Sequence, residues 1–310
     1  AARERRASRG RKKTENHQDA VDQEDALDEL HFKYGVPRYP LASFGAYPNP
    51  LHISDEDRAN FHPVVKFPMI WVEDVFGDRR RKPNYQIMDL TSIKGSDLLL
   101  SQEENEMARH ASFSHNKIDK LFSTMTGKTD DYGLTVGRYD ENRENLYSSK
   151  MFKNTEHQID GYSGARTLHL GIDLGAPVGT RIFAFSDAVV HSAGYNPDLG
   201  DYGYVLVLEH NLGASNFNGN IPRKLWALYG HLDEKSIKGM NKGKRIRKGK
   251  QIAKMGNALQ NGGWKLPHVH LQLSITPPST HDMPGVVAMD DRLQALRQYL
   301  DPRLVLGPLY

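Results

Sequence analysis

Two histidines separated by a single residue stand in the stretch PHVHLQL at residues 267–273. In a β-strand the side chains alternate between two faces, so His268 and His270 point the same way. The residues between and after them are apolar and predict burial on the opposite face: Val269, Leu271 and Leu273. Two imidazoles held side by side on one rigid strand are suited to binding a metal ion or to exchanging protons.

A second group of this kind lies upstream, where His169 and Asp173 are four positions apart. An extended segment places both side chains on one face, and Gly171 and Pro177 disfavour a helix here. His231 is a further, isolated candidate. Taken singly, such a histidine is more often a packed or solvent-facing residue than a ligand, so the hypothesis depends on all five residues converging.

Five candidates exceed the four ligands of a closed tetrahedral site. A catalytic zinc site has three protein ligands and one open position, which would leave the other histidines to handle protons. The chain contains no cysteine, so a zinc site here must use nitrogen and oxygen ligands. A single carboxylate among the ligands would leave a Zn²⁺ site with a net positive charge, which favours ionisation of a bound water.

Three short sequences, in this order, resemble the signatures of the lysostaphin-like (LytM-type) zinc endopeptidases: HLGID at 169–173, YGHL at 229–232 and PHVH at 267–270. The resemblance implies one Zn²⁺ per chain, held by His169, Asp173 and His270. It also implies that His231 and His268 form the catalytic pair around the attacking water and the scissile carbonyl. The fold that it implies is a compact antiparallel β structure of the duplicated-hybrid-motif type.

Two positions depart from the family pattern. The family usually has glycine in a turn where this chain has Asp187 and Ala188, so that hairpin is expected to differ. Family members often place a tyrosine shortly before the first histidine, where it assists oxyanion binding. Tyr162 lies near that place, but its alignment is loose, and we interpret it as a core or surface residue.

A second resemblance involves the flanks. GRYDE at 137–141, NGGW at 261–264 and DPRLVL at 301–306 resemble segments of peptidase modules found fused to class III aminotransferases. This resemblance implies that the substrate need not be bacterial cell wall and that a cytoplasmic setting is an alternative.

Downstream of Arg166, apolar and β-branched runs alternate with turn residues and predict a mainly β domain. The predicted strands span residues 181–195, 204–211, 225–232, 251–255 and 268–275, and a short amphipathic helix is predicted over 290–300. The predicted organisation is a disordered charged tail (1–30), an irregular helix-and-loop extension (31–160), the zinc peptidase domain (161–280) and a C-terminal helix and tail (281–310).

The chain before the first predicted ligand, His169, is far longer than a catalytic domain of this kind requires. The extension over residues 31–160 is expected either to wrap around the β domain as support or to occlude the active site, with a residue such as Asn116 or His157 donating to zinc as a latency device. The sequence leaves both interpretations open.

The predicted function is zinc-dependent hydrolysis of peptide bonds in glycine-rich or cell-wall-type cross-linking peptides, including peptidoglycan. The alternatives are a zinc amide hydrolase with another substrate and an inactive binding module of the same fold. A formal net charge of only +3 gives no reason to expect a nucleic-acid partner, and no apolar run is long enough for a membrane span. The family resemblance favours the cell envelope or the exterior over the cytoplasm.

Overall fold

The computed structural model describes residues 85–88, 90–110, 134–153, 159–211, 224–306 and 309. The predicted tail, the part of the extension before residue 85, and both Asn116 and His157 lie outside these residues. The prediction of a mainly β, largely antiparallel fold is confirmed. Within the described residues, no helix is both long and apolar enough to cross a membrane.

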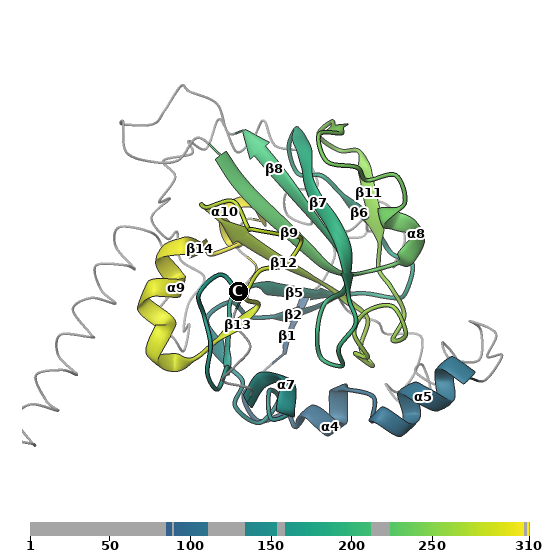
Figure 1. The fold of residues 1–310 in the computed structure, drawn as a ribbon, viewed down its shortest axis with the longest axis vertical. Coiled ribbons are helices and arrows are strands. Elements are labelled where there is room, and N and C mark those ends of the chain that lie inside the picture. Colours follow the sequence, from purple (N-terminus) through teal and green to yellow (C-terminus); the bar gives the residue numbers. More distant parts are fainter. Residues whose placement is uncertain are drawn as a thin grey trace, which may run out of the picture.

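One large sheet forms the centre of the molecule (Figure 1). Its strands are antiparallel to their neighbours except for the first two, β1 and β2, which run parallel. A short strand, β14 (Tyr299–Leu300), pairs with the end of β12. In spatial order the other strands are β1 (Tyr85–Met88), β2 (Leu134–Gly137), β5 (Ile172–Gly175), β12 (His268–Ser274), β9 (Lys224–Leu232), β8 (Gly203–Asn211), β7 (Ala188–Asn196) and β10 (Arg245–Ile246).

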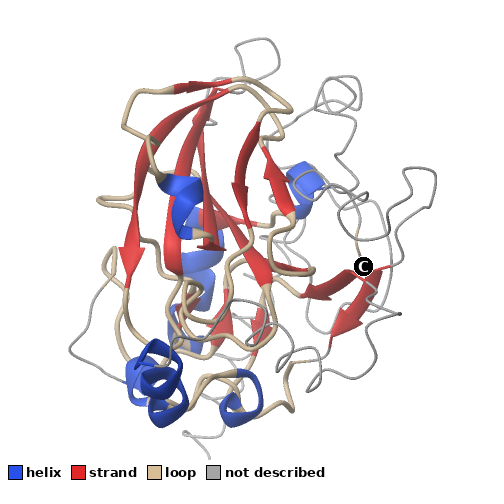
Figure 2. Ribbon diagram, turned by 90° about the vertical axis from the view of Figure 1, so that its right-hand side faces the viewer, coloured by secondary structure: helices blue, strands red, loops and turns tan. Residues whose placement is uncertain are grey.

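Two smaller sheets and several short helices complete the fold. One small sheet pairs β6 (Arg181–Phe183) with β11 (Gln251–Lys254), and the other has the order β13 (Val286–Val287), β4 (Leu168–His169), β3 (Glu141–Asn142). The helices are α4 (Gly95–Leu98), α5 (Gln102–His110), α7 (Lys150–Lys153), α8 (Glu234–Ile237), the 3₁₀ turn η2 (Met289–Asp291), α9 (Arg292–Gln298) and α10 (Arg303–Leu306). Helices α4, α5 and α7 gather at one end of the molecule, as both Figure 1 and Figure 2 show.

Strand β12 lies at the centre of the large sheet and is buried on both faces. Its apolar face carries Val269, Leu271 and Leu273, all fully buried, as the alternation predicts. The opposite face carries His270 and Gln272, which are buried as well. Burying such polar groups is costly unless each is hydrogen-bonded, so this face must have partners within the protein.

The chain before the predicted domain boundary contributes directly to this sheet. Strands β1 and β2 extend it beyond β5. Next to them, an apolar cluster joins Leu90, Leu99, Leu146 and Phe152 to Trp264, which comes from the C-terminal half. Burial of these side chains ties the two parts of the chain together.

Three sequence predictions of local structure need correction. The predicted strand 181–195 is two strands, β6 and β7, in different sheets, because the chain turns at Asp187, whose carboxylate accepts a hydrogen bond from the Lys248 amide at 2.7 Å. His169 and Asp173 are not on one extended segment but on β4 and β5, which belong to different sheets and are separated at Gly171. The predicted helix 290–300 is a 3₁₀ turn, α9 and β14 in succession.

Candidate active site

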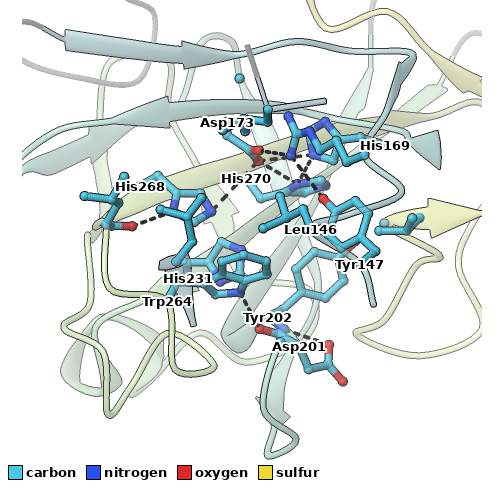
Figure 3. Close-up of a pocket in the computed structure, with 18 of the residues that line it drawn as sticks. Leu146, Tyr147, His169, Asp173, Asp201, Tyr202, His231, Trp264, His268 and His270 are labelled. Carbon is cyan, nitrogen blue, oxygen red and sulfur yellow. Dashed lines mark hydrogen bonds and ion pairs between the residues drawn. The ribbon is translucent and has the colours of Figure 1, made fainter. Parts of the chain in front are cut away.

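Three of the predicted site residues, His169, Asp173 and His270, meet in one place (Figure 3). His169 Nε2 lies 3.0 Å from His270 Nδ1 and 3.2 Å from Asp173 Oδ1, and His270 Nδ1 lies 3.0 Å from the same carboxylate oxygen. The two histidines are almost completely buried. Three potential ligand atoms therefore form a nearly equilateral triangle inside the protein.

In each imidazole one nitrogen faces the triangle (the inner nitrogen) and the other has a partner outside it (the outer nitrogen). The partner of the outer nitrogen determines whether the inner nitrogen carries a proton or a lone pair. His169 Nδ1 lies 2.8 Å from the carbonyl oxygen of Arg138, and His270 Nε2 lies 3.1 Å from the amide oxygen of Gln272. The Gln272 oxygen faces His270 because its NH₂ group donates to the Pro284 carbonyl at 3.2 Å. Both partners are acceptors, so both outer nitrogens carry the proton in a neutral ring. The inner nitrogens then present lone pairs.

The surroundings of His169 and Asp173 disfavour protonation of both groups. Burial, followed by the nearby positive charge of Arg143, lowers the pKa of His169 from 6.5 to about 4. Burial alone would raise the pKa of Asp173, but His169 and Arg143 outweigh it and hold this pKa well below its usual range. At neutral pH His169 is therefore a neutral imidazole and Asp173 a carboxylate, and together with the His270 ring they make up the donor set of a metal site.

Strand register brings these residues together. His270 on β12 is paired with Asp173 on β5 at one side and with Gly230 on β9 at the other. His169 reaches the same place from the adjoining small sheet, and Gly171 makes this approach possible. A Cβ atom at Gly171 would lie 2.4 Å from His270 Cε1, which is too close for two non-bonded carbon atoms.

His231 and His268 adjoin the triangle, with their ring centroids 4.3 Å apart. His231 Nδ1 lies 2.7 Å from the Asn261 carbonyl and His268 Nδ1 lies 2.8 Å from the Leu266 carbonyl. Each Nδ1 is therefore the protonated nitrogen in a neutral ring, and each Nε2 is free to accept a proton. Burial lowers the pKa of both, that of His231 well below 6.5. His268 Nε2 lies 4.0 Å from Asp173 Oδ1, so this free nitrogen faces the triangle.

A β-bulge in β9 determines the orientation of His231. The pairing of β8 with β9 shifts register between Tyr204–Leu232 and Leu206–Tyr229, which inserts one extra residue into β9. His231 itself has a φ of 64°, a conformation that non-glycine residues rarely adopt. Bulges of this kind redirect a side chain that the regular strand would point elsewhere.

A cavity adjoins all five residues. The wall opposite His231 and His268 comes from the chain before the predicted domain boundary and includes Leu146 and Tyr147 (Figure 3). Tyr162 is not part of this wall. It is 2% exposed, packs at a ring distance of 6.0 Å from Tyr299 and hydrogen-bonds to Gln298, so of the two interpretations, core or surface, it is a core residue.

Several residues at the site were not identified from the sequence. They are Arg143, Tyr147, Tyr202, Trp264 and Gln272. The unusual GRYDE and NGGW segments did single out the neighbourhoods of Arg143 and Trp264, but for a different reason. Only Gln272 carried a direct signal, because it continues the histidine-bearing face of β12 two positions beyond His270.

Comparison with known proteins now adds to this geometry. The model of peptidase family M23 matches residues 167–281. This stretch, hereafter the M23 segment, is similar to that family. It contains all five predicted site residues, and the resemblance to lysostaphin-like peptidases is confirmed. A comparison with curated proteins gave no significant match.

Among solved structures, a zinc-containing peptidase from Vibrio cholerae is 25% identical over 39% of this chain and 30% of its own length, with a TM-score of 0.27. The catalytic domain of the prophage-encoded M23 protein EnpA from Enterococcus faecalis is 21% identical over 43% of this chain and 94% of its own, with a TM-score of 0.26. The catalytic domain of the antimicrobial peptidase lysostaphin from Staphylococcus simulans is 19% identical over 46% and 88%, with a TM-score of 0.27.

The chain thus spans less than a third of the length of the Vibrio cholerae peptidase. The similarity to family M23 rests on the match of its model to residues 167–281. The TM-scores of 0.26–0.27 are too low to add support. The comparisons lend no support to the second resemblance, to modules fused to class III aminotransferases.

Proposed function

We propose that this protein is a zinc metalloendopeptidase in which His169, Asp173 and His270 hold the metal and His231 and His268 handle protons. The observation that carries the proposal is the triangle of lone pairs. Two imidazole nitrogens and a carboxylate oxygen face one another at 3.0–3.2 Å, and the protons of both imidazoles are committed to acceptors on the outside. Three such groups repel one another at this distance unless a cation lies between them.

The donor set and its size fit zinc. Bonds of about 2.0–2.1 Å in a tetrahedron place neighbouring ligand atoms roughly 3.3 Å apart, close to the observed edges of the triangle. A set of two nitrogens and one oxygen is a known arrangement of catalytic zinc sites, which keep a fourth position open. When bound, zinc would polarise the scissile carbonyl and make a water molecule more acidic.

The chain supplies the proton transfers. His231 and His268 each hold their Nδ1–H against a backbone carbonyl, so Nε2 is the nitrogen that can take a proton from the attacking water. The same nitrogen can later give this proton to the leaving amine. Their lowered pKa values keep both rings unprotonated at neutral pH, so each Nε2 has a lone pair available to accept a proton.

The substrate class is part of the proposal and rests on the family resemblance: glycine-rich or cross-linking peptides of the cell-wall type. Such a substrate implies action in the cell envelope or outside the cell. A zinc amide hydrolase with another substrate is the alternative, and the inactive binding module is less well supported because all five residues converge.

The test combines metal analysis with cleavage assays on the full chain. We expect one zinc per chain in the wild type, little zinc in His270→Ala, and full zinc with at least roughly 10²-fold slower cleavage in His231→Ala. His191→Ala is the control and should retain both properties, because this histidine hydrogen-bonds to the Pro278 carbonyl and contacts the Trp226 ring, neither of which belongs to the site.

Pentaglycine peptides and purified peptidoglycan are the substrates for this assay. A wild-type protein that binds no zinc, or a His231→Ala variant that cleaves normally, would refute the proposed mechanism. Zinc binding without cleavage of either substrate would favour the alternative amide hydrolase.

A further inference from the structure

A buried arginine, Arg143, binds Asp173 through the carboxylate oxygen that does not face the two histidines of the triangle. Arg143 is 1% exposed, and its Nη1 donates to Asp173 Oδ2 at 2.7 Å and to the Tyr147 hydroxyl at 3.0 Å. Its Nε donates to Glu141 Oε2 at 2.8 Å. Glu141, also fully buried, is paired through its other oxygen with Arg138. The network thus alternates positive and negative charges with no group left uncompensated, as burial requires.

The two oxygens of Asp173 have different partners. Oδ2 is taken by Arg143, whereas Oδ1 is the atom that lies 3.0 Å from His270 Nδ1 and 3.2 Å from His169 Nε2. A guanidinium that binds one oxygen from behind fixes the rotation of the carboxylate. It therefore presents a single oxygen, Oδ1, to the triangle.

The same short segment also orients His169. The carbonyl oxygen of Arg138 accepts from His169 Nδ1 at 2.8 Å and from Arg143 Nη2 at 3.3 Å. Two of the three potential ligands are consequently held by residues 138–143. This segment precedes residues 167–281, the part of the chain that matches the M23 family model.

The arginine leaves no room for a side chain at Gly137 on β2. Gly137 pairs with Asp173 in the register of β2 and β5. A Cβ atom at Gly137 would lie 2.7 Å from Arg143 Nη2 and 3.0 Å from Asp173 Oδ2. The guanidinium therefore packs directly on the backbone of β2, which limits its position relative to the carboxylate on that side.

We propose that Arg143 is a positioning residue of the metal centre, and that residues 137–147 complete a site that the M23 segment alone leaves unsupported. This inference rests on the proposed function, because it assigns Arg143 a role toward the metal that His169, Asp173 and His270 would bind. Partners of this kind, which orient ligands without touching the metal, typically change metal affinity by about 10–100-fold when they are removed.

The test measures the zinc dissociation constant of the full-length protein by competition with a chromogenic chelator. We expect Arg143→Gln to weaken zinc binding by about 10–100-fold. Arg143→Lys keeps the charge but loses the planar fork, so it should recover only part of the affinity. Peptide cleavage at saturating zinc should show a lower kcat with an unchanged KM, since Arg143 is almost completely buried and its guanidinium is bonded to Asp173, Glu141 and Tyr147.

A matched control separates positioning from folding. Arg303 is another buried arginine, paired with the Asp301 carboxylate through Nε and Nη2, and it does not line the cavity at the site. Arg303→Gln should lower the thermal midpoint but leave the zinc dissociation constant of the folded protein unchanged. If Arg143→Gln does not fold, Gly137→Ala provides the second variant, because its Cβ displaces the guanidinium without altering any charge.

Wild-type zinc affinity in folded Arg143→Gln, or in folded Gly137→Ala, would overturn the inference. An equal loss of zinc affinity in Arg303→Gln would also overturn it, because zinc binding would then depend on any buried arginine and not on the contact between Arg143 and Asp173. A wild-type protein that binds no zinc would instead refute the proposed function, so the two failures are distinguishable.

Discussion

At the scale of single residues, the candidate site depends on the absence of a side chain as much as on the presence of five. Gly171 lies between His169 and Asp173 in the sequence and beneath the ring of His270 in space. The ring can occupy its place in the triangle only because position 171 has no Cβ. The glycine of the HLGID signature is thereby explained by a steric requirement.

We expect Gly171→Ala to weaken zinc binding by at least tenfold, because the new methyl group would displace the His270 ring from the triangle. Zinc competition on the folded protein measures the effect. Gly179→Ala is the control: it strains a turn with φ of 83° but meets no atom within 4 Å, so it should cost stability without changing zinc affinity. Wild-type zinc binding by Gly171→Ala would contradict this account.

At the scale of the secondary-structure elements, β9 is shaped by the bulge that ends it. Gly230 is in register with His270, and His231 follows with a positive φ. The amide of His231 donates to the Tyr202 carbonyl at 2.8 Å, and its carbonyl accepts from the Gly256 amide at 2.9 Å. The bulge is thus held by hydrogen bonds from two other segments, which explains how a non-glycine residue keeps this backbone conformation.

We predict that Gly230→Ala retains zinc but slows peptide cleavage by roughly 10²-fold. The added Cβ would lie 2.6 Å from Tyr202 Cδ1, and this ring is buried, so the bulge must move and His231 with it. Steady-state kinetics with a zinc-saturated enzyme provide the measurement. Gly239→Ala, in a turn with open space around it, should cleave at the wild-type rate. Equal rates in the two variants would show that the bulge does not aim a catalytic group.

At the scale of the whole molecule, the described residues before position 154 belong to the structure of the β domain. They provide two strands of the large sheet, one side of the cavity and the arginine behind Asp173. These contacts favour the support role over the latency role for this part of the extension. The candidate latency residues, Asn116 and His157, lie outside the described residues, and their role stays a prediction.

Deletion of residues 1–150 tests the support role directly. We expect most of the shortened protein to be insoluble, because β5 loses its partner β2 and the apolar side chains around Trp264 become exposed. The soluble fraction and its zinc content are the measurements. A soluble fragment with wild-type zinc affinity and faster peptide cleavage would instead support the latency role.

A buried histidine remote from the site links the stability of the molecule to pH. His210 stacks on Phe185 at a ring distance of 4.1 Å, and burial lowers its pKa from 6.5 to about 3. Between these two values the unfolded chain binds a proton at His210 that the folded chain does not. The free energy of unfolding therefore decreases as the pH falls from 6.5 toward 3, and this contribution is complete above the unfolded pKa.

We expect His210→Gln to flatten this dependence by up to about 1.4 kcal/mol per pH unit within that window. Denaturant unfolding at a series of pH values, compared with the wild type, measures the difference in slope. Above about pH 7 the two curves should run parallel. Identical slopes below pH 6 would show that His210 does not resist protonation in the folded state.

Short stretches of the sequence are enough to predict most of the candidate metal-binding and catalytic residues. The period of two places His268 and His270 on one face of β12, and the lack of cysteine leaves nitrogen and oxygen as ligands. Both conclusions follow from local geometry and residue type. Most strand predictions after Arg166 hold for the same reason, since alternation and turn residues act over a few positions.

Only the tertiary structure decides how the site is supported. His169 and Asp173 lie on strands of different sheets, Arg143 reaches Asp173 from outside the M23 segment, and the bulge in β9 turns His231. No spacing in the sequence encodes these contacts, because each arises where segments far apart in the chain pack against one another. The orientation of an imidazole or a carboxylate depends on the atom behind it, and folding alone determines which atom that is.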